Sequence, residues 1–263
     1  MTTLHYLNFG WLHAPPNPKI SCHCLLLEDP AGLALVDTGI GLLDVADPVG
    51  RIGQPLIDLA GFQFNEADTA VHQLRRRGFR PEDVRHILLT HCDPDHAGGL
   101  ADFPEARVHV SAEEHAALTR GHPRYLPAHF GHGPRWAIHA AGPNDRDWFG
   151  LPARPVDLGF AADVLLVPLF GHTLGHCGVA VRPTPGGRWT LHAGDAYYLR
   201  PELSTDDHPV SAVSARQSVD NDQRVASLAL IRRLFRGHAD EVDLFGYHDT
   251  DELLERRGRD AAA

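Results

Sequence analysis

The feature that most restricts the fold of this chain is the placement of its histidines and aspartates, many of which follow apolar, strand-like segments. Such residues follow each of the segments HILLT, LLVPLFG, WTLHAG and VDLFGY. They are His91, Asp93, Asp95, His96, His172, Asp195 and His248. Loops at strand ends are held by a rigid scaffold, so side chains from distant parts of the chain can meet at one point there. His and Asp are common metal ligands. The sequence therefore predicts a metal site at the ends of several strands.

The apolar segments alternate with a few helical patterns. Strands are expected at residues 5–11, 21–29, 33–39, 84–90, 106–111, 163–169, 178–183, 188–195 and 241–248. Helices are expected at 66–78, 111–120 and 221–236, where Ser111 and Glu114 have the spacing of a capping box. Strands dominate both halves, each interrupted by helices, which favours two packed sheets with helices outside. We find no linker or repeat, so one domain over residues 1–263 is expected.

Residues 121–155 are rich in His, Pro, Gly and aromatic side chains and show no clean period. A long irregular segment in a compact domain is usually functional, so we expect an ordered cap over a pocket here. The C-terminal tail, residues 255–263, is expected to be frayed.

Composition excludes several classes of partner. The chain has 263 residues and a formal net charge of −10, which argues against nucleic acid and anionic membranes as partners. It shows no signal-peptide pattern and no apolar run long enough to span a membrane, so we expect a cytoplasmic protein. The four cysteines form no CxxC pair, and buried thiols are expected rather than disulfides. Among oligomeric states, a homodimer is left open.

The segment HCDPDHAGG has the spacing of a two-metal site. His91 and Asp93 lie two residues apart, so in an extended turn both side chains face one way and can hold one ion. After the bend at Pro94, Asp95 and His96 can reach a second ion. Imidazole and carboxylate ligands suit Zn²⁺, Mn²⁺ or iron.

These motifs resemble those of a known family. THCDPDHAGG is similar to the HxHxDH signature of the metallo-β-lactamase superfamily, and GHTLGH, AGDAYY and GYHD look like its later motifs, in family order. The resemblance implies an αββα sandwich of two mixed β-sheets with outer helices. It also implies that Asp195 bridges two metal ions, that His172 and His248 are ligands, and that Asp37 in VDTG supports the site from outside.

Within the superfamily the chain most resembles N-acyl-homoserine lactonases, on the string DHAGGLADFPEARVHVSAEEHAAL. Tyr198 stands where those lactonases have a tyrosine that hydrogen-bonds the substrate carbonyl, although Tyr197 could face the pocket instead. The implied function is hydrolysis of a lactone or another carboxylic ester, with two divalent ions, foremost Zn²⁺. Tyr198 would stabilise the oxyanion and Asp95 would pass a proton to the leaving alkoxide.

One residue departs from the family pattern, because Asp93 stands in place of the second histidine of HxHxDH. The exchange adds a negative charge and favours harder metals such as Mn²⁺ or iron. Two alternatives therefore stay open: an iron-dependent oxidoreductase or dioxygenase on the same fold, and a catalytically silent ligand-binding homologue. His176 is expected to have a supporting role. The histidines of the segment 121–155 are expected to be solvated or to line the pocket rather than to form a further metal cluster; they are His122, His129, His132 and His139.

Overall fold

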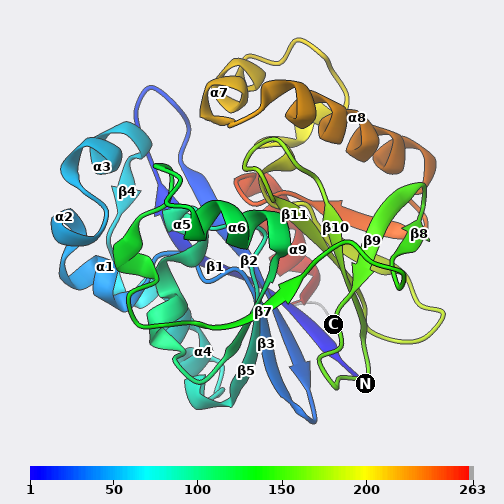
Figure 1. Cartoon of the computed structure of the whole chain (residues 1–263), viewed down its shortest axis with the longest axis horizontal. Helices are drawn as coiled ribbons and strands as arrows, with labels where there is room; N and C mark the ends of the chain where they lie inside the picture. Colours follow the sequence, from blue (N-terminus) through cyan, green and yellow to red (C-terminus); the bar gives the residue numbers. More distant parts are fainter. Residues whose placement is uncertain (261–263) are drawn as a thin grey trace.

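Two β-sheets packed face to face form the centre of the molecule (Figure 1). The computed structural model describes residues 1–260. The first sheet has the order β4-β1-β2-β3-β5-β6-β7, with the bounds Phe62–Gln63, Thr3–Leu12, Ile20–Asp29, Gly32–Val36, Val84–Leu88, Arg107–Ser111 and Arg135–His139. The second has the order β13-β12-β11-β10-β9-β8, with the bounds Val242–Phe245, Trp189–His192, Cys177–Arg182, Asp163–Pro168, Leu151–Pro155 and Arg146–Trp148.

Both sheets are mixed. In the first, β1, β2 and β3 pair antiparallel, whereas β3, β5, β6 and β7 run parallel. In the second, β12 and β13 are parallel and the other pairs are antiparallel. Parallel strands present their carboxyl ends at one edge, which is where β5, β12 and β13 lead into site loops.

Helices cover the outer faces of both sheets (Figure 1). The α-helices are α1 Leu42–Ala46, α2 Pro48–Arg51, α3 Gln54–Ala60, α4 Ala70–Arg76, α5 Pro94–Ala97, α6 Ala112–Thr119, α7 Val210–Gln217, α8 Asn221–Gly237 and α9 Thr250–Asp260. Short 3-10 turns are η1 Glu66–Asp68, η2 Pro81–Asp83, η3 Gly98–Asp102, η4 Pro127–His129, η5 Gly194–Ala196 and η6 Arg200–Leu203. Within residues 1–260 we find no helix that is both long and apolar enough to cross a membrane.

Strand alternation explains how two faces of one sheet are both buried. On β2, Leu25 and Leu27 face the second sheet, while Cys22, Cys24 and Leu26 face the helices on the outer side. Side chains at successive strand positions point to opposite faces, so these segments are continuously apolar rather than alternating. On the other side of the molecule, α8 packs its apolar stripe onto the second sheet. All four cysteines are buried and free, as the sequence predicts.

Residues 121–155 differ from the irregular cap expected from their composition. They contain η4 and three strands: β7 extends the first sheet, and β8 and β9 form the edge of the second. Trp148 is buried in the core under α8. These edge strands could not be predicted from the sequence, because they are short and carry polar residues at inward positions.

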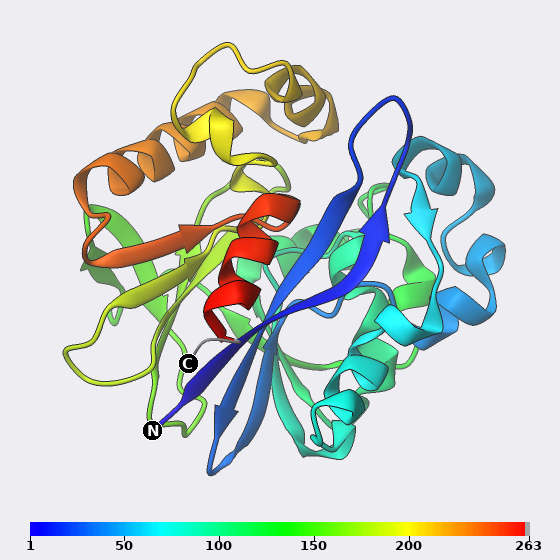
Figure 2. The ribbon, with the colours of Figure 1, turned by 180° about the vertical axis from the view of Figure 1, so that it is seen from behind.

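The prediction of a frayed tail is wrong for residues 255–260, which belong to α9; residues 261–263 lie outside the described part of the chain. Helix α9 packs against β1 and β2 (Figure 2). Its Leu253 is fully buried, and the Arg256 guanidinium donates hydrogen bonds to Asp243 and to the carbonyl of Leu244. The helix was not predicted because the many charged residues of this segment hid its amphipathic pattern.

Candidate metal centre

Loops at the ends of four strands bring the seven expected ligands together. The segment after β5 carries His91 to His96, the β10–β11 loop carries His172, and the segments after β12 and β13 carry Asp195 and His248. All seven are buried, with at most 9% of their surface exposed. Their donor atoms fall into overlapping groups that could each hold an ion, which are His91–Asp93–His172, His91–His96–Asp195 and Asp95–His96–His248.

We define two metal positions that share Asp195. The first metal position comprises His91, Asp93 and His172, and the second comprises Asp95, His96 and His248. At the first, Asp93 Oδ2 lies 3.2 Å from His91 Nε2 and 3.2 Å from His172 Nε2.

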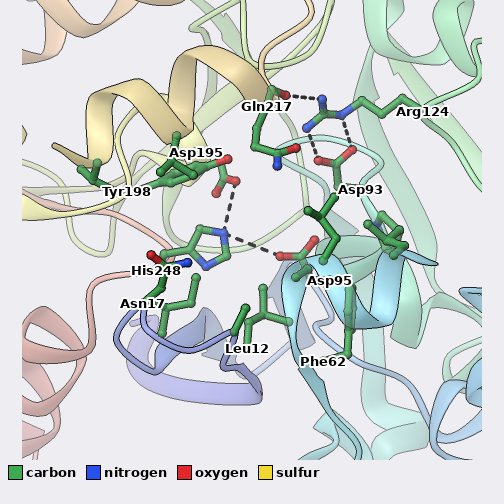
Figure 3. Close-up of a pocket in the computed structure, with 18 of the residues that line it drawn as sticks. Leu12, Asn17, Phe62, Asp93, Asp95, Arg124, Asp195, Tyr198, Gln217 and His248 are labelled. Atoms are coloured by element: carbon green, nitrogen blue, oxygen red, sulfur yellow. Dashed lines mark hydrogen bonds and ion pairs between the residues drawn. The ribbon is translucent and has the colours of Figure 1, made fainter. Parts of the chain in front are cut away.

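At the second position, Asp95 Oδ2 lies 3.7 Å from His96 Nε2 and 3.6 Å from His248 Nε2. Asp195 joins the two positions, because its Oδ2 lies 3.3 Å from His248 Nε2 (Figure 3) and 3.4 Å from His172 Nε2.

These separations fit a metal ion. Ligands at 2.0–2.2 Å from a tetrahedral ion lie about 3.3–3.6 Å from one another. The buried His91 Nε2, His96 Nε2 and Asp195 Oδ1 also have no hydrogen-bond partner within residues 1–260. Buried polar atoms are normally paired, so unpaired donor atoms that point at one another indicate a shared cation.

The ligands of the second position are held firmly from outside. His96 Nδ1 lies 2.9 Å from Asp37 Oδ2, and His248 Nδ1 lies 3.0 Å from the carbonyl oxygen of Ser21. Each contact places the proton on Nδ1 and leaves the Nε2 lone pair for a metal, as is common for histidine ligands. The sequence-based role of Asp37 as an outer support agrees with this geometry.

The first position is supported differently. His91 Nδ1 lies 3.0 Å from the Thr90 hydroxyl, but His172 Nδ1 has no hydrogen-bond partner in the described chain. A buried carboxylate, Glu114, holds the two loops instead.

The Glu114 carboxylate accepts hydrogen bonds from the Cys92 amide, the Thr173 hydroxyl, the Gly175 amide and the Tyr125 hydroxyl. It therefore ties the loop of His91 and Asp93 to the loop of His172. The predicted capping box is only half formed, since Ser111 Oγ accepts from the Glu114 amide but the Glu114 side chain turns to these loops. Sequence spacing identified Glu114 but assigned it the wrong partner.

Arg124 is a site residue that the sequence did not reveal. Its guanidinium donates to both Asp93 oxygens, with Nε 2.6 Å from Oδ1 (Figure 3). Its Nη2 lies 2.8 Å from His172 Nε2. Nη1 donates to the Gln217 carbonyl at the end of α7. Burial alone would raise the pKa of the Asp93 carboxyl, but Arg124 and His91 outweigh it and hold that pKa well below its usual range.

The two neighbouring tyrosines have different surroundings. The Tyr197 hydroxyl donates to Glu252 in the core beneath η6. Tyr198 lines the cavity above the ligands, with its ring centroid 5.2 Å from that of His248. Burial, followed by the nearby Asp195 charge, raises the pKa of Tyr198 well above its usual range, so its hydroxyl keeps its proton.

His176 supports the site, as predicted: its Nδ1 lies 2.9 Å from the Leu169 carbonyl, and its Nε2 accepts from the Asp195 amide. The histidines of residues 121–155 join none of the candidate metal groups in the described chain. His129 pairs with Asp44, and His139 is the end of a hydrogen-bonded ladder with His109 and His86 across β7, β6 and β5.

A cavity of about 820 Å³ opens onto both metal positions. Asp93, Asp95, Asp195 and His248 form its floor. Its walls are mostly apolar and come from the β1–β2 hairpin tip, α3 and α7, with Leu12, Ile20, Leu56, Leu59, Phe62, Val210 and Val213 among them. Of the segment 121–155, only Pro123, Arg124 and Leu126 line it, so the aromatic residues expected in a cap lie elsewhere.

Comparisons with known proteins agree with this geometry. The family model described as the metallo-beta-lactamase superfamily matches residues 18–234. A probable metallo-hydrolase from Mycobacterium bovis is 40% identical over 268 residues, covering 98% of this chain and 83% of the relative. An N-acyl homoserine lactonase from a Bacillus species is 32% identical over 225 residues, covering 82% of this chain and 80% of the relative.

Solved structures share the fold at lower identity. An N-acyl homoserine lactone hydrolase with the product N-hexanoyl-L-homoserine at its catalytic metal centre has a TM-score of 0.71 and 22% identity, over 96% of this chain and 95% of the other. The dizinc quorum-quenching lactonase AidC has a TM-score of 0.61 and 17% identity, over 95% of this chain and 88% of the other. The ordered motifs, the two mixed sheets and the converging ligands thus agree with these relatives: the chain belongs to the metallo-β-lactamase superfamily, among its lactonase-like metallo-hydrolases.

Proposed function

We propose that this protein opens a lactone or cleaves another carboxylic ester, with the seven clustered ligands holding divalent metal ions, foremost Zn²⁺. The observation that carries the proposal is the apolar cavity that ends on carboxylates, imidazoles and one phenol. A cavity of this kind suits a substrate with an apolar acyl part and a single polar reacting group. The relatives named N-acyl homoserine lactonases support the same substrate class.

When bound, the metal ions would supply Lewis acidity and an acidified water. Asp95 faces the cavity from α5, where its carboxylate can hold a proton and pass it to the departing alkoxide. Burial raises the pKa of the Asp95 carboxyl, which favours such proton transfer. The protonated Tyr198 hydroxyl, which lines the same cavity, would donate a hydrogen bond to the carbonyl oxygen as negative charge develops on it.

The apolar walls of the cavity would also limit the access of bulk water to this reaction. Apolar side chains of α3 and α7 wall the cavity, and a drier site strengthens each charge interaction inside it. The net charge of −10 gives no attraction for polyanionic substrates. None of the relatives named above is an oxidoreductase, so the iron-dependent alternative gains no support from them.

The test is turnover of acyl-homoserine lactones and aryl esters by purified protein of measured metal content. Tyr198→Phe is expected to lower kcat by about 100-fold, the cost of losing one oxyanion donor. Tyr197→Phe is the matched control, because its hydroxyl contacts Glu252 away from the cavity. Metal-loaded protein that turns over no member of the panel would contradict the proposal and favour a silent ligand-binding protein.

A further inference from the structure

The two metal positions differ in one contact that bears directly on metal binding. At the first position, Arg124 Nη2 lies 2.8 Å from His172 Nε2 and 2.5 Å from Asp93 Oδ2. His172 Nε2 and Asp93 Oδ2 are only 3.2 Å apart, so the guanidinium nitrogen contacts the same pair of donor atoms that an ion would use. At the second position, by contrast, the contacts to Asp95, His96 and His248 in the described chain include no Arg or Lys side chain.

The chemistry of the contact makes it exclusive. Arginine has five donors and no acceptor and stays protonated, so the Arg124 N–H must donate to His172. A neutral imidazole has a single lone pair on its unprotonated nitrogen. His172 Nε2 can therefore accept from Arg124 or bind a metal ion, but not both. Asp93 is not exclusive in this way, because each carboxylate oxygen has a second lone pair.

The distribution of charge also disfavours a metal ion at the first position. Asp93 adds a negative charge to the first position, and the half-buried Arg124 guanidinium neutralises it through two hydrogen bonds. A divalent ion that enters beside Arg124 meets a cation already paired with the carboxylate that should attract it. The second position keeps Asp95 without an Arg or Lys partner in the described chain, and its histidines are held by Asp37 and Ser21.

We propose that Arg124 is a built-in competitor for the first metal position, so that the protein binds one ion tightly at the second position and admits another only when Arg124 leaves His172. This inference rests on the proposed metal dependence and adds an order of metal loading to it. The guanidinium has a second anchor at the Gln217 carbonyl, so it has a place to remain when it releases His172. Occupancy of the first position is then set by an arginine rather than by ligand identity alone.

The experiment is a titration of metal-stripped protein with Zn²⁺, with affinities from a competing chromophoric chelator and ion counts from mass spectrometry. Wild type is expected to bind one ion at least about tenfold more tightly than the next, a difference of the size that outer contacts impose on metal affinity. Arg124→Gln is expected to bring the affinity for the second ion to within about tenfold of the first. Arg154→Gln is the matched control, because the buried Arg154 likewise donates to both carboxylate oxygens of one partner, the half-buried Glu113, away from the ligands.

Arg124→Lys provides a second variant, since lysine keeps the charge but lacks the fork that reaches both groups; its second-ion affinity should fall between those of wild type and Arg124→Gln. Two equally tight ions in wild type would overturn the inference. A loss of ions in Arg124→Gln and Arg124→Lys with folding intact would also overturn it, because Arg124 would then be a support for Asp93. Wild type that binds no Zn²⁺ would instead contradict the proposed function itself.

Discussion

The first and second metal positions use similar donors, yet they are built on different principles. The second is preorganised from outside: Asp37, directly after β3, and the Ser21 carbonyl, in β2, fix the two imidazoles. The first depends on two loops joined through Glu114, and a guanidinium contacts two of its donor atoms. The comparison teaches that ligand identity does not by itself determine affinity, because the groups around the ligands decide which lone pairs are free.

The largest effect should come from removing one histidine at each position. His248→Ala is expected to lower the affinity for the tightest ion by more than about 100-fold, beyond the loss typical of an outer contact. His172→Ala should leave that ion bound, because His172 belongs to the position that Arg124 contacts. Zn²⁺ competition titrations of both variants measure the difference, and equal losses would erase the distinction between the positions.

The outer support of the second position gives the next largest effect. Asp37→Asn removes the carboxylate beside His96 Nδ1 and should weaken the tightest ion by about 10–100-fold. Asp44→Asn is the matched control, since Asp44 is a buried carboxylate paired with His129 outside the site. If both variants bind Zn²⁺ as tightly as wild type does, the contact between Asp37 and His96 does not contribute to the affinity of the second position.

Glu114 tests the support of the first position. Glu114→Gln turns one acceptor into a donor that faces an amide, and it should lower the free energy of unfolding by about 2–3 kcal/mol. It should also weaken the binding of the ion at the first metal position while leaving the tighter ion, at the second position, unchanged. Denaturant unfolding and Zn²⁺ titration measure the two effects, with Glu113→Gln as the control, because Glu113 is a half-buried α6 carboxylate paired with Arg154 away from the ligands. A loss confined to the tightest ion would contradict this assignment.

A smaller effect, a loss of stability at acid pH, should come from His109, which lies outside both metal positions. Burial, followed by His139 and His86, lowers the pKa of His109 to about 3. The unfolded chain protonates this residue below about pH 6.5 while the folded chain does not, so stability is lost as pH falls from 6.5 toward 3. Between pH 7 and pH 5 this should cost about 2 kcal/mol. Unfolding of wild type and His109→Gln at both pH values measures it, since metal release is common to both; an equal acid loss in the variant would exclude the ladder as the cause.

Much of the fold and the clustering of the seven candidate side chains could be predicted from the sequence, because both depend on local patterns. Apolar runs followed by His or Asp identified the strands that lead into the site. The spacing within HCDPDH predicted four of the candidate ligands. Asp195 and His248 followed from the same rule applied later in the chain.

The rest depends on contacts between distant residues, for which spacing carries no signal. Arg124 lies 31 residues from Asp93 and 48 from His172, in a segment without a period. Glu114 looked like a capping residue because its local spacing was right, but its side chain found four partners in other loops. The edge strands of residues 121–155 and helix α9 were missed because their polar residues are paired only in the folded molecule, as Arg256 is with Asp243.

The walls of the cavity come from the β1–β2 hairpin tip, α3 and α7, and these three pieces provide none of the seven clustered ligands. Changes in their length or apolar side chains can therefore alter what the cavity admits without moving a single donor atom of the centre. Such a division allows the cavity to change shape while the clustered His and Asp side chains stay in place. It also makes the hairpin tip and α7 the places to graft when a differently shaped cavity is wanted.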